Sequence, residues 1–269
     1  MNEAGVPTEI NAPLPEAKPA AAEASNRDPF GSLQSLQSLA STIVIAIFVI
    51  VFTVQAFQIP SESMEKTLLI GDYLLVDKAH YGHSGIWGWL MPYRPIRRQD
   101  IIVFRYPTDP RQHFVKRVVA VPGDHVRLID KHVYVDGVRQ DDSYATFNWA
   151  SRDRFRDNFP DGGFYGDKIS AAWFLQAQKL LEDGQLIVPE GAYFVLGDNR
   201  DDSYDSRYWG FVPQENIVGR PLVIYWSMDQ SAPETIGEPP PSDKLSGLRL
   251  NVAGLFSSLR WRRMMQIPH

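Results

Sequence analysis

The sequence predicts a mainly β protein, in which an antiparallel, barrel-like β domain follows a single N-terminal transmembrane helix. Two observations lead to this prediction. Residues 39–59 contain no charged side chain, and the chain that follows them consists largely of short apolar segments separated by turn residues. A long uncharged segment is typical of a membrane span, and short strands with frequent turn signals are typical of an antiparallel β domain.

The N-terminal region divides into a polar tail and an apolar segment. Residues 1–38 are rich in Ala, Pro, Glu and Ser, which predicts a disordered tail. Residues 39–59 would extend roughly 30 Å as a helix, the thickness of the hydrocarbon layer. Their β-branched residues favour strand in water, but in lipid the backbone must be hydrogen-bonded within the segment, and a helix achieves this. A cleavable signal peptide or a buried helix are the alternatives; the long acidic tail disfavours the first and apolarity on all faces the second.

Residues 60–228 are predicted to form the β-rich domain. The segment VYVDGVRQ, with Asp136 and Gly137 at its centre, indicates a hairpin. An irregular insertion is expected at about 141–184, because its first part is dense in Asp, Arg, Asn and Gly. Within it, residues 170–182 precede a glycine and are predicted to form a short helix.

The C-terminal region is predicted to contain a linker and a basic segment. Residues 229–243 are rich in Pro, Ser and Glu, as linkers are. Residues 244–269 form a basic amphipathic segment with five basic residues and no acidic one. Two interpretations remain open for it: binding to anionic lipid, and packing on the β domain.

Composition excludes several kinds of function. The net charge of -5 disfavours a nucleic-acid-binding protein, whose phosphate contacts usually require a basic excess. The absence of cysteine excludes thiol nucleophiles and cysteine-ligated zinc. Neither an H-E-x-x-H nor a G-x-S-x-G motif is present, and no histidine lies in a pattern that pairs it with a serine. We therefore expect no metal and no cofactor.

Three segments carry candidate chemistry. Ser61 and Ser63 lie in IPSESMEKTLLIGD, Lys116 lies in FVKRVVAVPGD, and residues 197–210 read GDNRDDSYDSRYWG. Taken alone, each has an ordinary explanation: a turn, a lysine extending to solvent, and a solvated loop. Strand alternation, however, gives Lys116 apolar neighbours on its own face. Burial there could lower its pKa by the roughly 3 units, on the order of 4 kcal/mol, that a useful base requires.

In combination, these segments resemble the type I signal peptidases, membrane-bound Ser/Lys proteases that include bacterial leader peptidase. That family carries P-S-x-S-M-x-P-T-L-x-x-G-D after a membrane span, and PSESMEKTLLIGD is similar to it. The family's next three motifs are matched, in order, by DIIVFRYP, KRVVAVPGD and GDNRDDSYDSRYWG. The resemblance covers roughly residues 57–226.

The resemblance implies a role for each matched residue. Ser63 would be the nucleophile and Lys116 its base. The Ser61 hydroxyl would bind the oxyanion together with the Ser63 amide, and Ser203 would orient Lys116. The loop residues that would support the site are Asp198, Arg200, Asp205 and Arg207. The groove for small substrate side chains, and hence for A-x-A sites, would be lined by Phe57, Ile59, Met64, Leu68 and Val115.

The resemblance also implies partners and a location. The substrates would be exported pre-proteins carrying signal peptides, and the other partners would be the lipid bilayer and the protein translocation machinery. The catalytic domain would lie on the outer, periplasmic face of the inner membrane, although the flanking charges hardly select an orientation. Two positions depart from the family motif: Lys66 replaces the usual proline and Glu62 a common glycine. We hypothesise that the Lys66 charge helps to keep Lys116 neutral.

Two other functions are compatible with parts of the sequence. A self-cleaving Ser/Lys repressor-type protease would share the serine and lysine, but residues 1–38 are too short and polar for its DNA-binding domain. A membrane-anchored β-rich binding or assembly module without protease activity is the second alternative. Cleavage of an exported precursor distinguishes this module from a peptidase.

Overall fold

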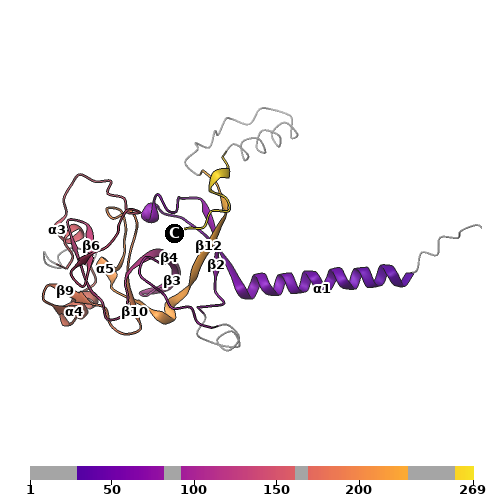
Figure 1. Cartoon of the computed structure of the whole chain (residues 1–269), viewed down its shortest axis with the longest axis horizontal. Coiled ribbons are helices and arrows are strands. Elements are labelled where there is room, and N and C mark those ends of the chain that lie inside the picture. Colours follow the sequence, from indigo (N-terminus) through magenta and orange to yellow (C-terminus); the bar gives the residue numbers. More distant parts are fainter. Residues whose placement is uncertain (1–28, 82–91, 161–168, 230–257) are drawn as a thin grey trace, which may run out of the picture. The chain divides into compact units, whose positions relative to one another are not determined.

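The computed structural model describes residues 29–81, 92–160, 169–229 and 258–269, with the side chains of 29–32 and 49–52 excepted. By its internal contacts the chain divides into two units, residues 1–45 and 46–269, and all the strands lie in the second (Figure 1). Residues 1–28 of the predicted tail, 230–243 of the predicted linker and 244–257 of the predicted basic segment lie outside the described residues.

Helix α1 spans Pro29–Thr53, which corrects the predicted limits of the N-terminal elements. Residues 29–38, predicted to be disordered, are helical. The predicted helix 39–59 ends early because Val54–Gln58 form strand β1, which pairs antiparallel with β2, Asp72–Asp77. Where side chains are described, no helix is both long and apolar enough to cross a membrane.

The larger sheet has seven strands in the order β1-β2-β12-β3-β4-β10-β11, and its pairings are antiparallel. This confirms the mainly β, antiparallel fold class. In the described part of the chain no pairing joins β1 to β11, so the sheet is open rather than a closed barrel. The strands not yet given are β3 (Ile101–Tyr106), β4 (Asp109–Ala120), β10 (Ala192–Leu196), β11 (Val212–Pro213) and β12 (Ile217–Ser227).

The smaller sheet has five strands in the order β7-β6-β5-β9-β8. Its predicted hairpin is present: Asp136 and Gly137 join β6 to β7 with φ values of 52° and 77°, as a two-residue turn between twisted strands requires. The strands are β5 (His125–Ile129), β6 (His132–Val135), β7 (Val138–Arg139), β8 (Leu181–Glu182) and β9 (Gln185–Ile187).

Short helices connect and cover these strands. Helix α4, Ala171–Lys179, lies where a helix was predicted and begins at Ser170, whose hydroxyl accepts a hydrogen bond from the Trp173 amide. Trp173 in turn packs in the core beside the smaller sheet. The other helices in the described part of the chain are η1 (Glu62–Met64), α3 (Arg154–Asp157), α5 (Ser206–Trp209), η2 (Gln214–Asn216) and η3 (Trp261–Arg263).

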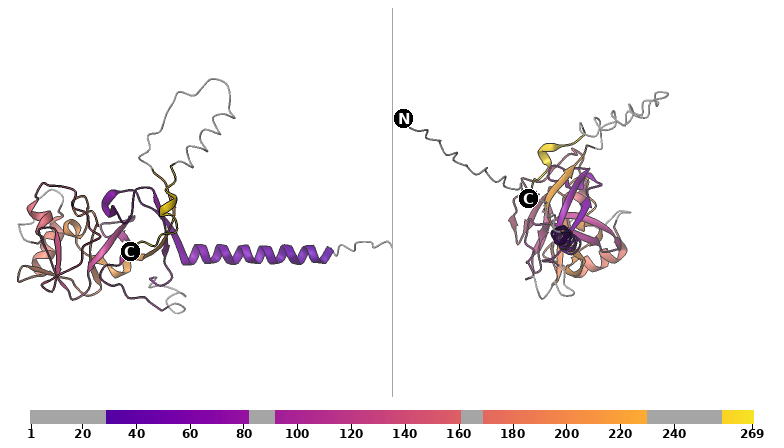
Figure 2. Two further views of the ribbon diagram at one scale, coloured as in Figure 1. Left: turned by 45° about the horizontal axis from the view of Figure 1, so that its top comes forward. Right: turned by 90° about the vertical axis from the view of Figure 1, so that its right-hand side faces the viewer.

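The described end of the basic segment, residues 258–269, packs on the larger sheet (Figure 2). Leu259 forms a bridge with Met228, and the Met265 amide donates to the Ile224 carbonyl of β12. Arg263 forms an ion pair with Asp72, a fully buried residue of β2. Residues 258–269 therefore pack on the β domain, which was one of the two interpretations of the C-terminal segment.

Candidate active site

Ser63 is held in a tight turn directly after the edge strand β1. Pro60 restricts the backbone, Ser61 is extended with φ of −138°, and Ser63 occupies the middle of the single-turn helix η1. The Ser63 carbonyl accepts a hydrogen bond of 3.1 Å from the Asn199 amide. The turn is thus fixed from the opposite side by the loop that follows β10.

Lys116 approaches Ser63 from β4. Its Nζ lies 2.5 Å from Ser63 Oγ and 5.8 Å from the centroid of the Phe114 ring, and the lysine is only 5% exposed. Burial lowers the pKa of Lys116 from 10.5 to about 8, against the charges of Asp205 and Asp198, which raise it. Roughly a tenth of the amine is therefore neutral at pH 7, compared with well under one part in a thousand at its ordinary pKa, and this neutral fraction can accept the hydroxyl proton.

Ser61 and Ser203 both lie beside this pair. Ser61 Oγ is 3.3 Å from Ser63 Oγ, and Ser61 is exposed on the cleft side. Ser203 is buried, and its hydroxyl has no hydrogen-bond partner among the described residues, so the bond to Lys116 that its expected role requires is not formed in this structure. A Cβ atom at position 197 would overlap both Ser203 and the Ser63 carbonyl. Gly197 therefore permits the close contact between the loop and the serine turn.

The four predicted supporting residues are all buried, and each binds within or beside the loop. Arg207 forms a bidentate pair with Asp205 at 2.8 and 2.9 Å, and Asp205 also accepts a hydrogen bond from the Gly197 amide. Burial raises the pKa of Asp205, but the charge and hydrogen bonds of Arg207 outweigh it and lower that pKa overall. Arg200 donates to the carbonyl groups of Gly197 and Lys131, and Asp198 accepts from Thr67 at 2.6 Å.

Arg117 is a supporting residue that the sequence analysis missed. It follows Lys116 on the opposite face of β4 and forms a bidentate pair with Asp198 at 2.8 and 2.7 Å. Both side chains are buried, with exposed fractions of 3% and 0%. Strand alternation placed Arg117 opposite Lys116, but only the fold reveals that Asp198 lies within its reach.

A cleft of about 560 Å³ opens at Ser63 and Lys116. Four of the five predicted groove residues line it: Phe57, Ile59, Met64 and Val115. Leu68 is not among its lining residues, because its side chain is fully buried in the core cluster behind the cleft. The sequence analysis did not predict these lining residues: Gln112, His113, Phe114, Asp202 and Tyr204.

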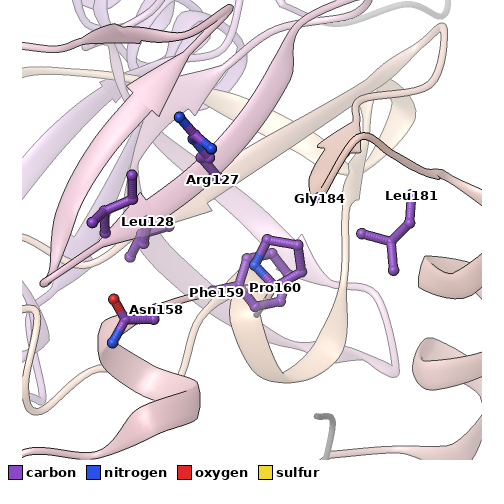
Figure 3. Close-up of a pocket in the computed structure, with 8 residues that line it drawn as sticks. Arg127, Leu128, Asn158, Phe159, Pro160, Leu181 and Gly184 are labelled. Atoms are coloured by element: carbon purple, nitrogen blue, oxygen red, sulfur yellow. The ribbon is translucent and has the colours of Figure 1, made fainter. Parts of the chain in front are cut away.

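A second pocket, of about 540 Å³, lies at the smaller sheet (Figure 3). Arg127 and Leu128 of β5 line it together with Asn158, Phe159 and Pro160. None of the described residues around it carries a hydroxyl, a carboxylate or an imidazole, so proton transfer is assigned to the first cleft. The described chain also gathers no three His, Cys, Asp or Glu side chains at which a metal could bind.

Comparison with known proteins identifies the family. A family model described as signal peptidase, peptidase S26, matches residues 32–226. Signal peptidase I of Buchnera aphidicola is 35% identical over 245 residues, covering 74% of this chain and 77% of that protein. Signal peptidase I of Pseudomonas fluorescens is 38% identical over 194 residues (65% and 66%), and that of Aquifex aeolicus is 37% identical over 219 residues (69% and 80%). The chain therefore belongs to the signal peptidase family, peptidase S26.

Proposed function

We propose that this protein is a membrane-anchored serine endopeptidase that removes signal peptides from exported pre-proteins after small-x-small (A-x-A) sites. Its catalytic groups are Ser63 and Lys116. The observation that carries the proposal is the 2.5 Å separation of the Lys116 amine from the Ser63 hydroxyl in a setting that lowers the pKa of the lysine to about 8. A serine becomes nucleophilic only when a neighbouring base removes its proton.

The reaction follows from these positions. Neutral Lys116 accepts the Ser63 proton while Ser63 Oγ bonds to the substrate carbonyl carbon. The resulting oxyanion accepts hydrogen bonds from the Ser61 hydroxyl and the Ser63 amide, and each such donor is worth about 3 kcal/mol. The C–N bond then breaks, and the leaving amine takes the proton from Lys116. In the second half, Lys116 removes a proton from water as the water oxygen attacks the ester carbon. The ester C–O bond then breaks, and Lys116 returns the proton to Ser63 Oγ.

The shape of the cleft supports the proposed specificity. Ile59, Met64 and Val115 bring apolar side chains close to Ser63, and the first two are almost fully buried. The wall beside the nucleophile is therefore apolar. Small residues before the cleaved bond fit this arrangement.

The membrane anchor is assigned to residues 39–53, the apolar part of α1, because residues 54–58 pair with β2 as strand β1. Large apolar side chains of α1 are exposed on several faces, among them Leu39, Ile43, Val44, Ile47 and Phe48. Exposed apolar surface of this extent is unfavourable in water and favourable in lipid. The domain carrying Ser63 would then face the periplasm, where the translocation machinery delivers pre-proteins.

Cleavage of a pre-protein by the full chain in detergent tests the proposal. Wild-type protein should release the mature chain at its A-x-A site, whereas Ser63→Ala and Lys116→Met should lower kcat by at least about 1,000-fold. Lys179→Met, which changes an exposed lysine of α4, is the matched control and should retain activity. Undiminished cleavage by Ser63→Ala would exclude the dyad. Failure of folded wild-type protein to cleave would favour a binding or assembly module.

A further inference from the structure

The cleft has an apolar part and an acidic part. Phe57, Ile59 and Val115 line the first, whereas Glu62 and Asp202 contribute carboxylates to the second. Glu62 directly precedes Ser63, and Asp202 is near enough to Lys116 for its charge to act on the amine. Both carboxylates therefore lie close to the bond that would be cleaved.

Neither carboxylate is paired within the described part of the chain, and both residues are exposed. The acidic side chains nearby are partnered: Glu65 accepts hydrogen bonds from Asn148 and Asn199, and Asp201 forms an ion pair with Lys131 at 2.7 Å. Glu62 and Asp202 thus keep their acceptors available to a ligand in the cleft.

The chemistry of Ser63 and Lys116 does not explain why carboxylates lie in the cleft. Asp202 raises the pKa of Lys116 and so opposes formation of the neutral base. A negative charge at this place works against catalysis unless it also acts on the substrate. An approaching cation would be attracted to it.

An aromatic wall stands beside the carboxylates. Tyr204 lines the cleft, is 43% exposed, and stacks on Tyr208 with ring centroids 5.6 Å apart. Its hydroxyl accepts a hydrogen bond from Tyr106 at 3.4 Å, which helps to fix the ring. Carboxylates near a fixed phenol ring, whose π face attracts cations, form a favourable setting for an ammonium or guanidinium group.

We propose that Glu62, Asp202 and Tyr204 are specificity-determining residues that favour a basic side chain just after the cleaved bond, in the chain that is released. The inference rests on the proposed function. The apolar part of the cleft suits the residues before the bond, so the acidic part remains for those after it. A basic residue there would pair with two carboxylates, and an acidic one would be repelled by them.

Three otherwise identical peptide substrates test this inference, with Lys, Gln or Glu as the first residue after the A-x-A site. At low salt, wild-type kcat/KM should be about tenfold higher for Lys than for Glu, with Gln between them. The preference should shrink at 0.5 M salt, because the carboxylates are exposed and therefore screened.

Substitutions of Glu62 and Asp202 then test whether these residues cause the preference for Lys over Glu. Glu62→Gln combined with Asp202→Asn should reduce the Lys-to-Glu ratio to about twofold or less. Glu190→Gln, which removes an exposed carboxylate outside the cleft, should leave the ratio unchanged. Asp202→Asn also changes the pKa of Lys116 and therefore the rate with every peptide, so the Lys-to-Glu ratio is measured within each variant. Should the double variant fold poorly, Glu62→Gln alone should still lower the ratio, since Glu62 is exposed.

The outcomes separate the two proposals. Equal, Ser63-dependent cleavage of all three peptides by the wild-type protein would overturn the charge preference and leave the peptidase intact. A preference that survives the double variant would assign it to other residues and reject this inference. Absence of cleavage of every peptide and of a pre-protein would reject the peptidase itself.

Discussion

Arg117 binds both carboxylate oxygens of Asp198 from the strand residue that directly follows Lys116. Alternation along β4 directs Lys116 toward the cleft and Arg117 toward the loop on the other face. Asp198 raises the pKa of Lys116, so a partner that neutralises Asp198 keeps this effect small. The buried ion pair therefore affects both the stability of the loop and the protonation of the base.

Replacement of Arg117 should test this coupling. Arg117→Met leaves the Asp198 carboxylate buried without its charge partner, which should cost about 3–5 kcal/mol of stability. The pH dependence of kcat/KM should move to higher pH, because an uncompensated Asp198 raises the pKa of Lys116. Adding Asp198→Asn removes the orphaned charge and should return the midpoint toward the wild-type value. An unmoved midpoint in folded Arg117→Met protein would contradict the coupling.

The wild-type pH profile reports the base directly. Since Lys116 must be neutral to accept a proton, kcat/KM should rise with pH and level off above a midpoint of about 8. His113 also lines the cleft, and burial lowers its pKa, so it would titrate at a lower pH. His113→Gln should leave the midpoint near 8. Loss of the rise around pH 8 in this variant would assign the titration to the histidine instead.

Lys116 should also reduce stability, with a defined pH dependence. Its pKa falls from 10.5 to about 8 on folding, so the unfolded chain binds more protons between these values. The resulting cost, about 3 kcal/mol, is fully present below pH 8 and disappears as pH rises toward 10.5. Lys116→Met should therefore raise the free energy of unfolding at pH 7, and the gain should vanish near pH 10.5. Denaturant unfolding at both pH values, with Lys179→Met as control, measures it.

The sequence predicts the strands and the chemical groups better than it predicts their contacts. The 136–137 hairpin and the 171–179 helix follow from local turn and capping signals, which act within a few residues. The limits of α1 do not follow from local signals. Val54–Gln58 are apolar enough for a span and become a strand only through pairing with β2. Local pattern cannot reveal a partner that lies elsewhere in the chain.

In the candidate site, too, the sequence predicts the chemical groups but not their long-range contacts. Ser63, Lys116 and the loop 197–210 carry recognisable motifs, but Leu68 shares the motif of Ser63 and points into the core. Arg117 and Tyr204 were missed because their importance depends on long-range neighbours, Asp198 and the cleft. The hypothesis that Lys66 keeps Lys116 neutral finds no support: the leading influences on that amine are burial and the charges of the loop residues.

The C-terminal residues should stabilise the turn that carries Ser63. Arg263 contacts the Asp72 carboxylate at 2.6 Å and donates to the Thr67 carbonyl at 2.8 Å, so it links the C-terminal end to the segment after Ser63. Arg263→Ala leaves Asp72, which is fully buried, with the neutral donors Ser227 and Leu69 as the partners that the described residues provide for its carboxylate. We expect a loss of about 3 kcal/mol. Arg262→Ala, an exposed neighbour, should change stability by less than about 0.5 kcal/mol.

Position 66 should accept glycine but not proline. Its φ is 75°, in the left-handed region that disfavours most side chains and that proline cannot adopt. Proline is the residue that the family motif carries at this position. Lys66→Gly should therefore maintain or raise stability by up to about 1 kcal/mol, whereas Lys66→Pro should lower it by about 3 kcal/mol or more and displace Ser63. Thermal unfolding and peptide cleavage measure both effects. A fully stable, active Lys66→Pro variant would mean that this turn adopts another conformation in solution.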